Sequence, residues 1–276
     1  MSGTELSQIP RQNADASFIV SGRFGKNRLE ITLDQLLKGA GLGIDPIEIP
    51  DLTWSTGNAT YYVDNTLGND SNPGTDALPF KTIAKVLSLI PTVIRWGHIY
   101  NIYFKTATWN EALALNGKCV LGVLRFMGND FTPGNHQIAG IDMQNVFGRV
   151  LFQYLKSTRT GLHAILINSS VGEIWVQFCE VTNADASYCA LRTAEGADIM
   201  VYGGTYSNRL VGLLADYYSR IVTYDVVSGS GNTYGVRAAH GGILQCALSS
   251  VPTGTTPYSA EDGAILVKAS GVVLGS

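Results

Sequence analysis

Apolar residues recur in a fixed pattern along the second half of the chain. A short apolar strand start returns from residue 149 onward, at spacings of 24, 25, 22 and 22 residues, at Val150, Ile174, Ile199, Ile221 and Ile243. A second apolar run precedes each new turn, starting at Ala164, Ala190, Gly212, Gly235 and Ala264. Two short strands per unit, with Gly or Ser between them and no helix, predict a parallel β-helix in which each unit is one rung. A β-sandwich does not return the same residue class to the same column.

Alternation along each strand assigns the repeated positions to two faces. We expect an inward ladder in the first strands, at Ile174, Ile199, Ile221 and Ile243, and two residues further on at Val176, Val201 and Thr223. A second inward ladder is expected at Leu191, Leu213, Val236 and Ile265. The same phase puts Trp175, Met200, Val222 and Leu244 on the outer face. Because a monomer rarely exposes a contiguous apolar stripe, this column predicts a subunit interface; a phase error of one residue is the alternative.

The first part of the chain has a different character. Residues 1–43 contain strand-like runs at 17–20 and 28–32, a turn at 22–26 and a short helix that Asp34 can cap. Residues 44–59 contain Pro46 and Pro50 with little periodicity, which predicts a linker. From residue 60 follow a strand, a polar loop and a helix over 80–89 that Pro91 ends, and rungs begin at about residue 98. The expected division is 1–43, 44–59 and 60–276.

Composition removes several classes of protein. Charged residues make up 15% of the chain and hydrophobic residues 45%, which excludes a helical bundle, a coiled coil and a disordered chain. A net charge of −3 argues against nucleic-acid binding through phosphate neutralisation. So little charge is available to coat the surface that we expect another chain to cover part of it.

Cysteine spacing and the start of the chain limit the remaining possibilities. Cys119, Cys179, Cys189 and Cys246 form no C-x-x-C pair and have no His cluster near them. They therefore read as small buried hydrophobic residues, and we expect neither a metal site nor a cofactor. The start lacks a Sec signal, and no run reaches 18 apolar residues, so we expect a protein made in a cytosol and not inserted in a membrane.

Two segments resemble known families. Residues 61–91, YYVDNTLGNDSNPGTDALPFKTIAKVLSLIP, resemble the opening of pectate-lyase-like right-handed β-helix proteins, and residues 100–117 and 124–128 are similar to the next stretch. This resemblance implies an all-β, right-handed, single-stranded parallel β-helix with a capping helix. Residues 1–43, with ELSQIP near the start and then KNRLEITLDQLL, resemble the N-terminal segment of tailed-bacteriophage tail spikes and fibres.

The two resemblances together imply a structural virion protein, a phage tail spike or fibre that attaches to the host cell surface. Such proteins are usually homotrimers. Residues 1–43 would bind other tail or portal-region proteins, and host surface polysaccharide is a further expected partner. The expected location is the virion, after synthesis in the host cytoplasm and release by lysis. The alternatives are a polysaccharide-degrading tail spike and a head fibre or decoration protein. The final GVVLGS reads as part of another rung, so we expect a truncated spike or a stub that another protein extends.

Glycan cleavage commonly needs two carboxylates about 5 to 10 Å apart, and rungs stack about 4.8 Å apart. The candidate acids are Asp142, Glu180, Asp198, Asp216 and Asp225. They align poorly, since Glu180 is expected to stack on Thr205 and Val227, and Asp225 on Gly203 and Phe178. Glu195 is expected near Tyr217 and His240. We therefore interpret these acids as solvated turn residues and lean against an enzyme.

Two adjacent tyrosines offer another kind of site. Tyr202 and Tyr224 fall in one column, where stacked rings could bind sugars. Packing in a subunit interface is the alternative for this pair. The loop 68–76, GNDSNPGTD, resembles a cation-binding loop in composition, but Asx and Gly turn chemistry explains it better.

Overall fold

The computed structural model describes residues 19–24, 27–32, 53–246, 250–268 and 271–275. The chain divides into two compact units, residues 1–51 and residues 52–276. In the first unit, β1 (Ile19–Phe24) pairs antiparallel with β2 (Asn27–Thr32), where two strand-like runs were expected. The short helix expected after Asp34 lies outside the described residues.

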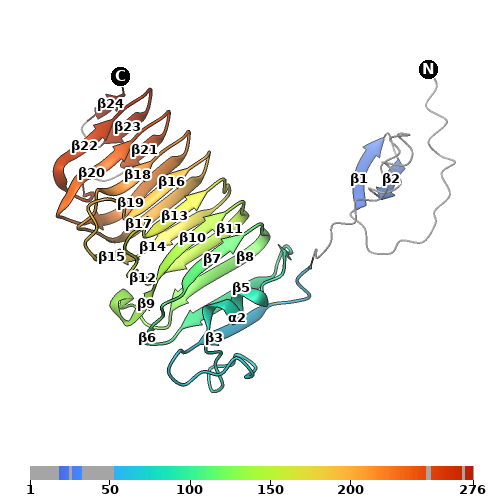
Figure 1. Ribbon diagram of the computed structural model, residues 1–276. Helices are drawn as coiled ribbons and strands as arrows, with labels where there is room; N and C mark the ends of the chain where they lie inside the picture. The colour runs from blue at the N-terminus through green and yellow to red at the C-terminus, as the bar shows by residue number, and fades with distance from the viewer. Residues whose placement is uncertain (1–18, 25–26, 33–52, 247–249, 269–270, 276) are drawn as a thin grey trace. The chain divides into compact units, whose positions relative to one another are not determined.

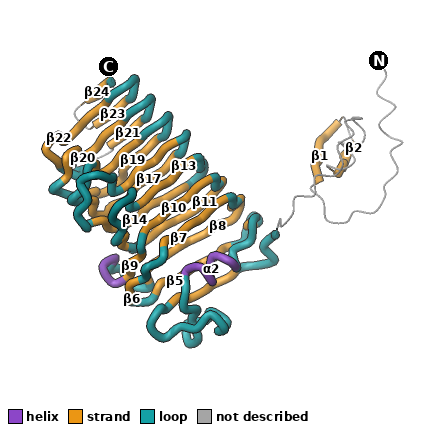
Figure 2. Tube along the Cα trace, in the orientation of Figure 1, coloured by secondary structure: helices purple, strands orange, loops and turns teal. Residues whose placement is uncertain are grey.

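The second unit is an all-β parallel solenoid of about seven turns, consistent with a right-handed parallel β-helix. Figure 1 shows its strands stacked side by side, and Figure 2 shows how little of it is helical. The first sheet consists of β3 (Ala59–Val63), β5 (Ile99–Phe104), β8 (Cys119–Gly128), β11 (Phe147–Gln153), β14 (Ile174–Gln177), β17 (Asp198–Tyr206), β19 (Arg220–Ser228), β21 (Ile243–Cys246) and β23 (Ile265–Lys268), with β24 (Gly271–Leu274) antiparallel on β23.

A second sheet runs along another side of the solenoid. It consists of β7 (Ala112–Asn116), β10 (Gly140–Gln144), β13 (Ile165–Asn168), β16 (Leu191–Ala194), β18 (Val211–Ala215), β20 (Asn232–Ala238) and β22 (Gly254–Ala260). The short strands are β4 (Val93–Ile94), β6 (Ala107–Thr108), β9 (His136–Ile138), β12 (Lys156–Ser157) and β15 (Glu180–Val181). A single 3-10 turn, η2 (Pro133–Asn135), precedes β9 in the described chain. The rungs that begin with β5 to β21 each carry a strand on both sheets, and several of them carry a third short strand.

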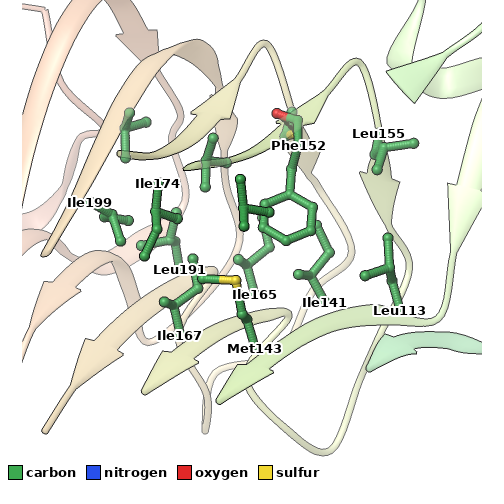
Figure 3. Close-up of a cluster of buried hydrophobic side chains, with 14 of the residues drawn as sticks. Leu113, Ile141, Met143, Phe152, Leu155, Ile165, Ile167, Ile174, Leu191 and Ile199 are labelled. Atoms are coloured by element: carbon green, nitrogen blue, oxygen red, sulfur yellow. Dashed lines mark hydrogen bonds between the residues drawn. The ribbon is translucent and has the colours of Figure 1, made fainter. Parts of the chain in front are cut away.

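Inward side chains fill the space between the sheets with one continuous core (Figure 3). Ile174 and Ile199 are partners in the parallel ladder, Ile221 continues it, and all three are fully buried. Phe126 and Phe152, also fully buried partners, stack with ring centroids 5.5 Å apart and an interplanar angle of 10°. Each rung closes its inner face only against its neighbours, because a single rung has no second apolar layer of its own.

The inward position expected in the last unit, Ile243, is wrong by one residue. Leu244, not Ile243, stacks on Ile221 and is fully buried, whereas Ile243 pairs with Arg220 and is 37% exposed. The cause is a bulge in β19: Tyr224 pairs with Tyr202, but the partner of Gly204 is Val227, so β19 holds one extra residue. A β-bulge adds a residue to one strand and delays every later position by one.

The second misplaced residue is Ile265. It lies in β23 of the first sheet, where it pairs with Ile243, and not in the second-strand ladder. In that ladder Val236 stacks on Tyr258 of β22. The β22 sequence, GTTPYSA, is polar and contains a proline, so hydrophobic periodicity does not reveal it as a strand.

The loop that precedes the helix is tied by a carboxylate. Asp70 accepts hydrogen bonds from the backbone N–H groups of Lys81 (2.9 Å) and Thr82 (3.0 Å) and from the Thr82 hydroxyl (2.8 Å). Thr82 in turn caps α2 (Ile83–Ser88) by accepting the Lys85 N–H. Turn chemistry thus accounts for Asp70 in the loop 68–76. The helix is shorter than the expected 80–89, and its buried face joins the solenoid core.

Candidate functional site

The two candidate tyrosines lie side by side on the outer face of the first sheet. Tyr202 of β17 and Tyr224 of β19 are register partners, and they are 37% and 38% exposed. Each is followed by a residue in the left-handed backbone region, Gly203 at φ +65° and Asp225 at φ +57°. This conformation ends the straight run of each strand and turns the chain sharply at the same place in successive rungs.

Aromatic residues also follow the matching strands in three earlier rungs, at least one residue beyond the column of Tyr202 and Tyr224. Tyr154 and Phe178 follow β11 and β14 and are themselves left-handed, at φ +55° and +50°. Their rings stack at 5.3 Å with an interplanar angle of 6°. Phe131, which follows β8 and is 83% exposed, packs edge-on against Tyr154 at 5.1 Å. In the next rung the Tyr202 ring packs edge-on against the Phe178 ring, with centroids 5.4 Å apart and an interplanar angle of 81°.

We call these five residues, Phe131, Tyr154, Phe178, Tyr202 and Tyr224, the aromatic row. A glycine makes room for one of its rings: a Cβ at Gly203 would lie 2.6 Å from Cδ1 of Phe178. Any side chain there would therefore displace the Phe178 ring. From the sequence we expected only Tyr202 and Tyr224 at this surface. A signal for two more members was present, because the pairs Gln153–Tyr154 and Gln177–Phe178 recur 24 residues apart at the ends of matching strands.

The outward apolar column lies next to the aromatic row. Trp175, Met200 and Val222 are register partners in β14, β17 and β19, and Leu151 of β11 precedes them. The outward position expected for Leu244 is wrong. Its side chain points into the core, and Gln245 takes the outward position beside Val222. Val222 is only 6% exposed. The Trp175 ring reaches Tyr224, with centroids 5.9 Å apart, so the column and the row form one continuous surface.

Most of the candidate acids are held by basic side chains. Asp142 binds the Arg159 guanidinium through both oxygens, at 2.7 and 2.5 Å. Asp198 binds Arg220 in the same way, at 2.9 and 2.6 Å. Glu180 lies 4.0 Å from Lys156. The two bidentate contacts, of Asp142 and of Asp198, satisfy both carboxylate oxygens. The contact of Asp198 with Arg220 also ties β17 to β19.

The stacking expected for two of these acids is partly correct. Glu180 does pair with Thr205, but the next residue in that column is Ser228 and not Val227, because of the bulge in β19. Asp225 sits in that bulge, directly after Tyr224. Among the acids, Asp225 is thus the one that adjoins the aromatic row in sequence.

The cluster expected around Glu195 is real only in part. Tyr217 stacks on His240, with ring centroids 4.6 Å apart and an interplanar angle of 7°. Glu195 occupies an equivalent left-handed turn position, but its carboxylate accepts a hydrogen bond from Ser169 at 2.7 Å. His240 instead contacts two other carboxylates: Asp216 lies 2.6 Å from Nδ1 and Asp262 lies 3.3 Å from Nε2. The acids of this cluster are therefore Asp216 and Asp262.

Asp216 also contacts a half-buried pair of basic side chains, Arg192 and His163. Its Oδ2 accepts from Nη2 of Arg192 at 2.8 Å, and Nη1 of Arg192 lies 3.3 Å from Nε2 of His163. His163 Nδ1 accepts the Cys189 N–H at 3.1 Å. Burial first, and then the positive charge of Arg192, lower the pKa of His163 to about 4. His163 is therefore neutral at pH 7, and the group is a structural network across rungs.

Other chemistry-bearing groups are few. Cys179, Cys189 and Cys246 are buried and Cys119 is half-buried, and all four are free. Burial raises the pKa of the Cys179 and Cys189 thiols to about 12, so neither is a nucleophile at neutral pH. Within the described ranges, no cluster of three or more His, Cys, Asp or Glu residues has a geometry that could hold a metal ion. No helix in the described part of the chain is long and apolar enough to cross a membrane.

The fold and this surface define an all-β parallel β-solenoid with an outer row of aromatic side chains. Searches against protein-family models, curated proteins and solved structures found no match to the chain.

Proposed function

We propose that this chain is a structural attachment protein of a tailed bacteriophage, a tail spike or fibre that binds polysaccharide on the host surface. The observation that carries the proposal is the aromatic row, which extends over five successive rungs from Phe131 to Tyr224. Such rings offer large, rigid, apolar contact area and, at the tyrosines, a polar hydroxyl. A solenoid holds them in line, because each rung is fixed by its neighbours.

The binding we propose is not hydrolytic. Three of the candidate acids are engaged: Asp142, Asp198 and Asp216 each bind an arginine. A carboxylate held by a guanidinium in this way is not free to protonate a glycosidic oxygen. A depolymerase remains the competing function, and the same polysaccharide assay detects it by release of oligosaccharides.

We predict that the double substitution Tyr202→Ala with Tyr224→Ala weakens binding to host polysaccharide by about 10-fold, since each aromatic contact contributes about 0.5–1.5 kcal/mol. Biolayer interferometry against immobilised capsular polysaccharides and lipopolysaccharides measures the loss. Tyr218→Ala is the matched control, because Tyr218 is 81% exposed at a different turn. Equal binding by the double variant and the control contradicts a binding role for the row.

We further propose a mode of assembly for this chain. Residues 1–43 attach the chain to other tail or portal-region proteins, and the protein resides in the virion after synthesis in the host cytoplasm and lysis. The chain forms a homotrimer through Trp175 and Met200 of the outward apolar column, beside which Val222 is already buried within its own chain. The low charge content of 15% supports a surface covered by sister subunits. A head fibre or decoration protein would share this architecture.

We predict that Met200→Arg converts the trimer to a monomer, because it places an unpaired charge at the centre of a buried apolar interface. Multi-angle light scattering measures the mass. The control is Val226→Arg, which changes a 58% exposed residue of the β19 bulge outside this column. A wild-type chain that is monomeric at micromolar concentration contradicts the interface. A mass change in the Tyr202 and Tyr224 double variant would instead place the row in the interface.

A further inference from the structure

A groove lies near the start of the solenoid, away from the aromatic row. Its volume is about 380 Å³, which is within the range of small-molecule sites. Three segments line it: residues 96–99, residues 120–123 of β8, and residues 147–149 of β11, with Glu173 at one end. These segments belong to consecutive rungs, so the groove runs along the stacking direction of the solenoid.

Backbone geometry keeps the groove open. Val120 pairs with Gly148, but the next pair is Leu124 with Val150, so β8 carries two more residues than β11 at this point. A Cβ at Gly148, where φ is +119°, would overlap the Val120 carbonyl, and one at Gly122 would overlap the His98 carbonyl. Both positions therefore require glycine, and neither contributes a side chain that could fill the groove.

The walls of the groove are apolar and its rim is charged. Trp96 and Phe147 are 79% and 54% exposed, and Ile99, Leu121 and Val123 complete the apolar lining. At the rim, Nε of Arg149 forms an ion pair with Glu173. Exposed aromatic rings beside a charged pair offer contact area for an apolar face and hydrogen bonds for polar groups around it.

One oriented imidazole supplies a polar contact in the lining. Nδ1 of His98 lies 2.6 Å from Oγ of Ser55, which is 1% exposed and accepts the Arg95 N–H at 2.9 Å. The Ser55 hydroxyl can donate to Nδ1, which fixes the His98 ring through that nitrogen. In this arrangement the other ring nitrogen, Nε2, carries a proton and is a hydrogen-bond donor.

We propose that this groove binds an N-acetylated amino sugar. An acetamido group combines a methyl group, which suits the apolar walls, with a carbonyl oxygen that accepts from Nε2–H of His98. The sugar face packs on Trp96, and the ring hydroxyls reach Arg149 and Glu173. This inference extends the proposed glycan binding to a second surface with a stated sugar class, and its residues are separate from the aromatic row.

Saturation-transfer NMR on the full chain tests the site. The probes are the methyl glycoside of N-acetylglucosamine and methyl glucoside, which lacks the acetamido group. We expect saturation to be strongest at the acetyl methyl protons and binding of methyl glucoside to be at least about 5-fold weaker, since one hydrogen bond and one methyl contact are lost. His98→Phe keeps an aromatic ring but removes Nε2–H, and it should weaken binding of the acetylated sugar by about 5-fold.

Trp96→Ala should abolish the signal, and because Trp96 is mostly exposed this variant should fold normally, as circular dichroism checks. The Tyr202 and Tyr224 double variant should bind the acetylated probe like wild type. Equal binding of the two glycosides overturns the proposal, as does full binding by the Trp96 and His98 variants. Loss of polysaccharide binding only in the tyrosine variant, with no signal from either glycoside, overturns the groove site and leaves the proposed function standing.

Discussion

Replacing Phe152 with alanine is expected to lower the free energy of unfolding by about 3–5 kcal/mol, the cost of removing a fully buried phenyl ring. Phe152 is completely buried, and its ring stacks on Phe126 at 5.5 Å. The ring also bridges rungs, since its register partners are Phe126 of β8 and Val176 of β14. The cavity therefore weakens two interfaces between rungs. Urea unfolding followed by circular dichroism measures the change.

Two further variants make this measurement specific. Phe152→Leu keeps most of the apolar volume and should cost less than half as much as alanine. Phe178→Ala removes an aromatic ring from the outer aromatic row instead of the core, and should cost much less because that ring is partly exposed. Equal losses in Phe152→Ala and Phe178→Ala would contradict the assignment of these rings to opposite faces. In a solenoid the first transition can be local, so hydrogen exchange at β8, β11 and β14 should show it.

The second large effect is on acid stability. The pKa of His163 is about 4 in the folded chain, lowered first by burial and then by Arg192, and about 6.5 in an unfolded chain. Between these values the unfolded state binds the extra proton, so stability rises with pH across that window and is lost as the pH falls from 6.5 toward 4. Lowering the pH from 7 to 4.5 should cost about 2 kcal/mol through this one residue, after allowing for its partial exposure.

His163→Gln isolates the contribution. The glutamine can still accept the Cys189 N–H that Nδ1 of His163 accepts, but it does not titrate. The variant should be close to wild type at pH 7 and should lose about 2 kcal/mol less than wild type on transfer to pH 4.5. Thermal unfolding at both pH values gives the comparison. Equal losses of stability in wild type and variant between pH 7 and pH 4.5 would show that His163 takes up no extra proton on unfolding.

Periodicity alone predicts much of this fold. The inward positions of Ile174, Ile199 and Ile221, and the pairing of Tyr202 with Tyr224, follow from a repeat that returns one residue class to one column. These positions are predictable because a rung has no core except its neighbours, so every rung must present apolar side chains in register. A sandwich with the same strand count would impose no such column.

Local backbone events were not predictable from the pattern. The bulge in β19 moves the register by one, and Ile243 and Leu244 are both apolar, so nothing in the sequence distinguishes which of them points inward. The rings at Tyr154 and Phe178 were missed for another reason. They occupy left-handed turn positions, where bulky residues are uncommon, and so they fall outside the alternation that marks a strand.

The bulge in β19 also has a consequence for how this protein can change. One inserted residue is absorbed between Tyr224 and Val227, and the following strands resume their pairing, with Leu244 on Ile221 and Leu266 on Leu244. Rung length is therefore free to vary at that turn while the core columns stay aligned. Insertion of a further residue at this turn is therefore expected to leave the buried columns in register. The chain combines a fixed interior with a turn of adjustable length beside the aromatic row.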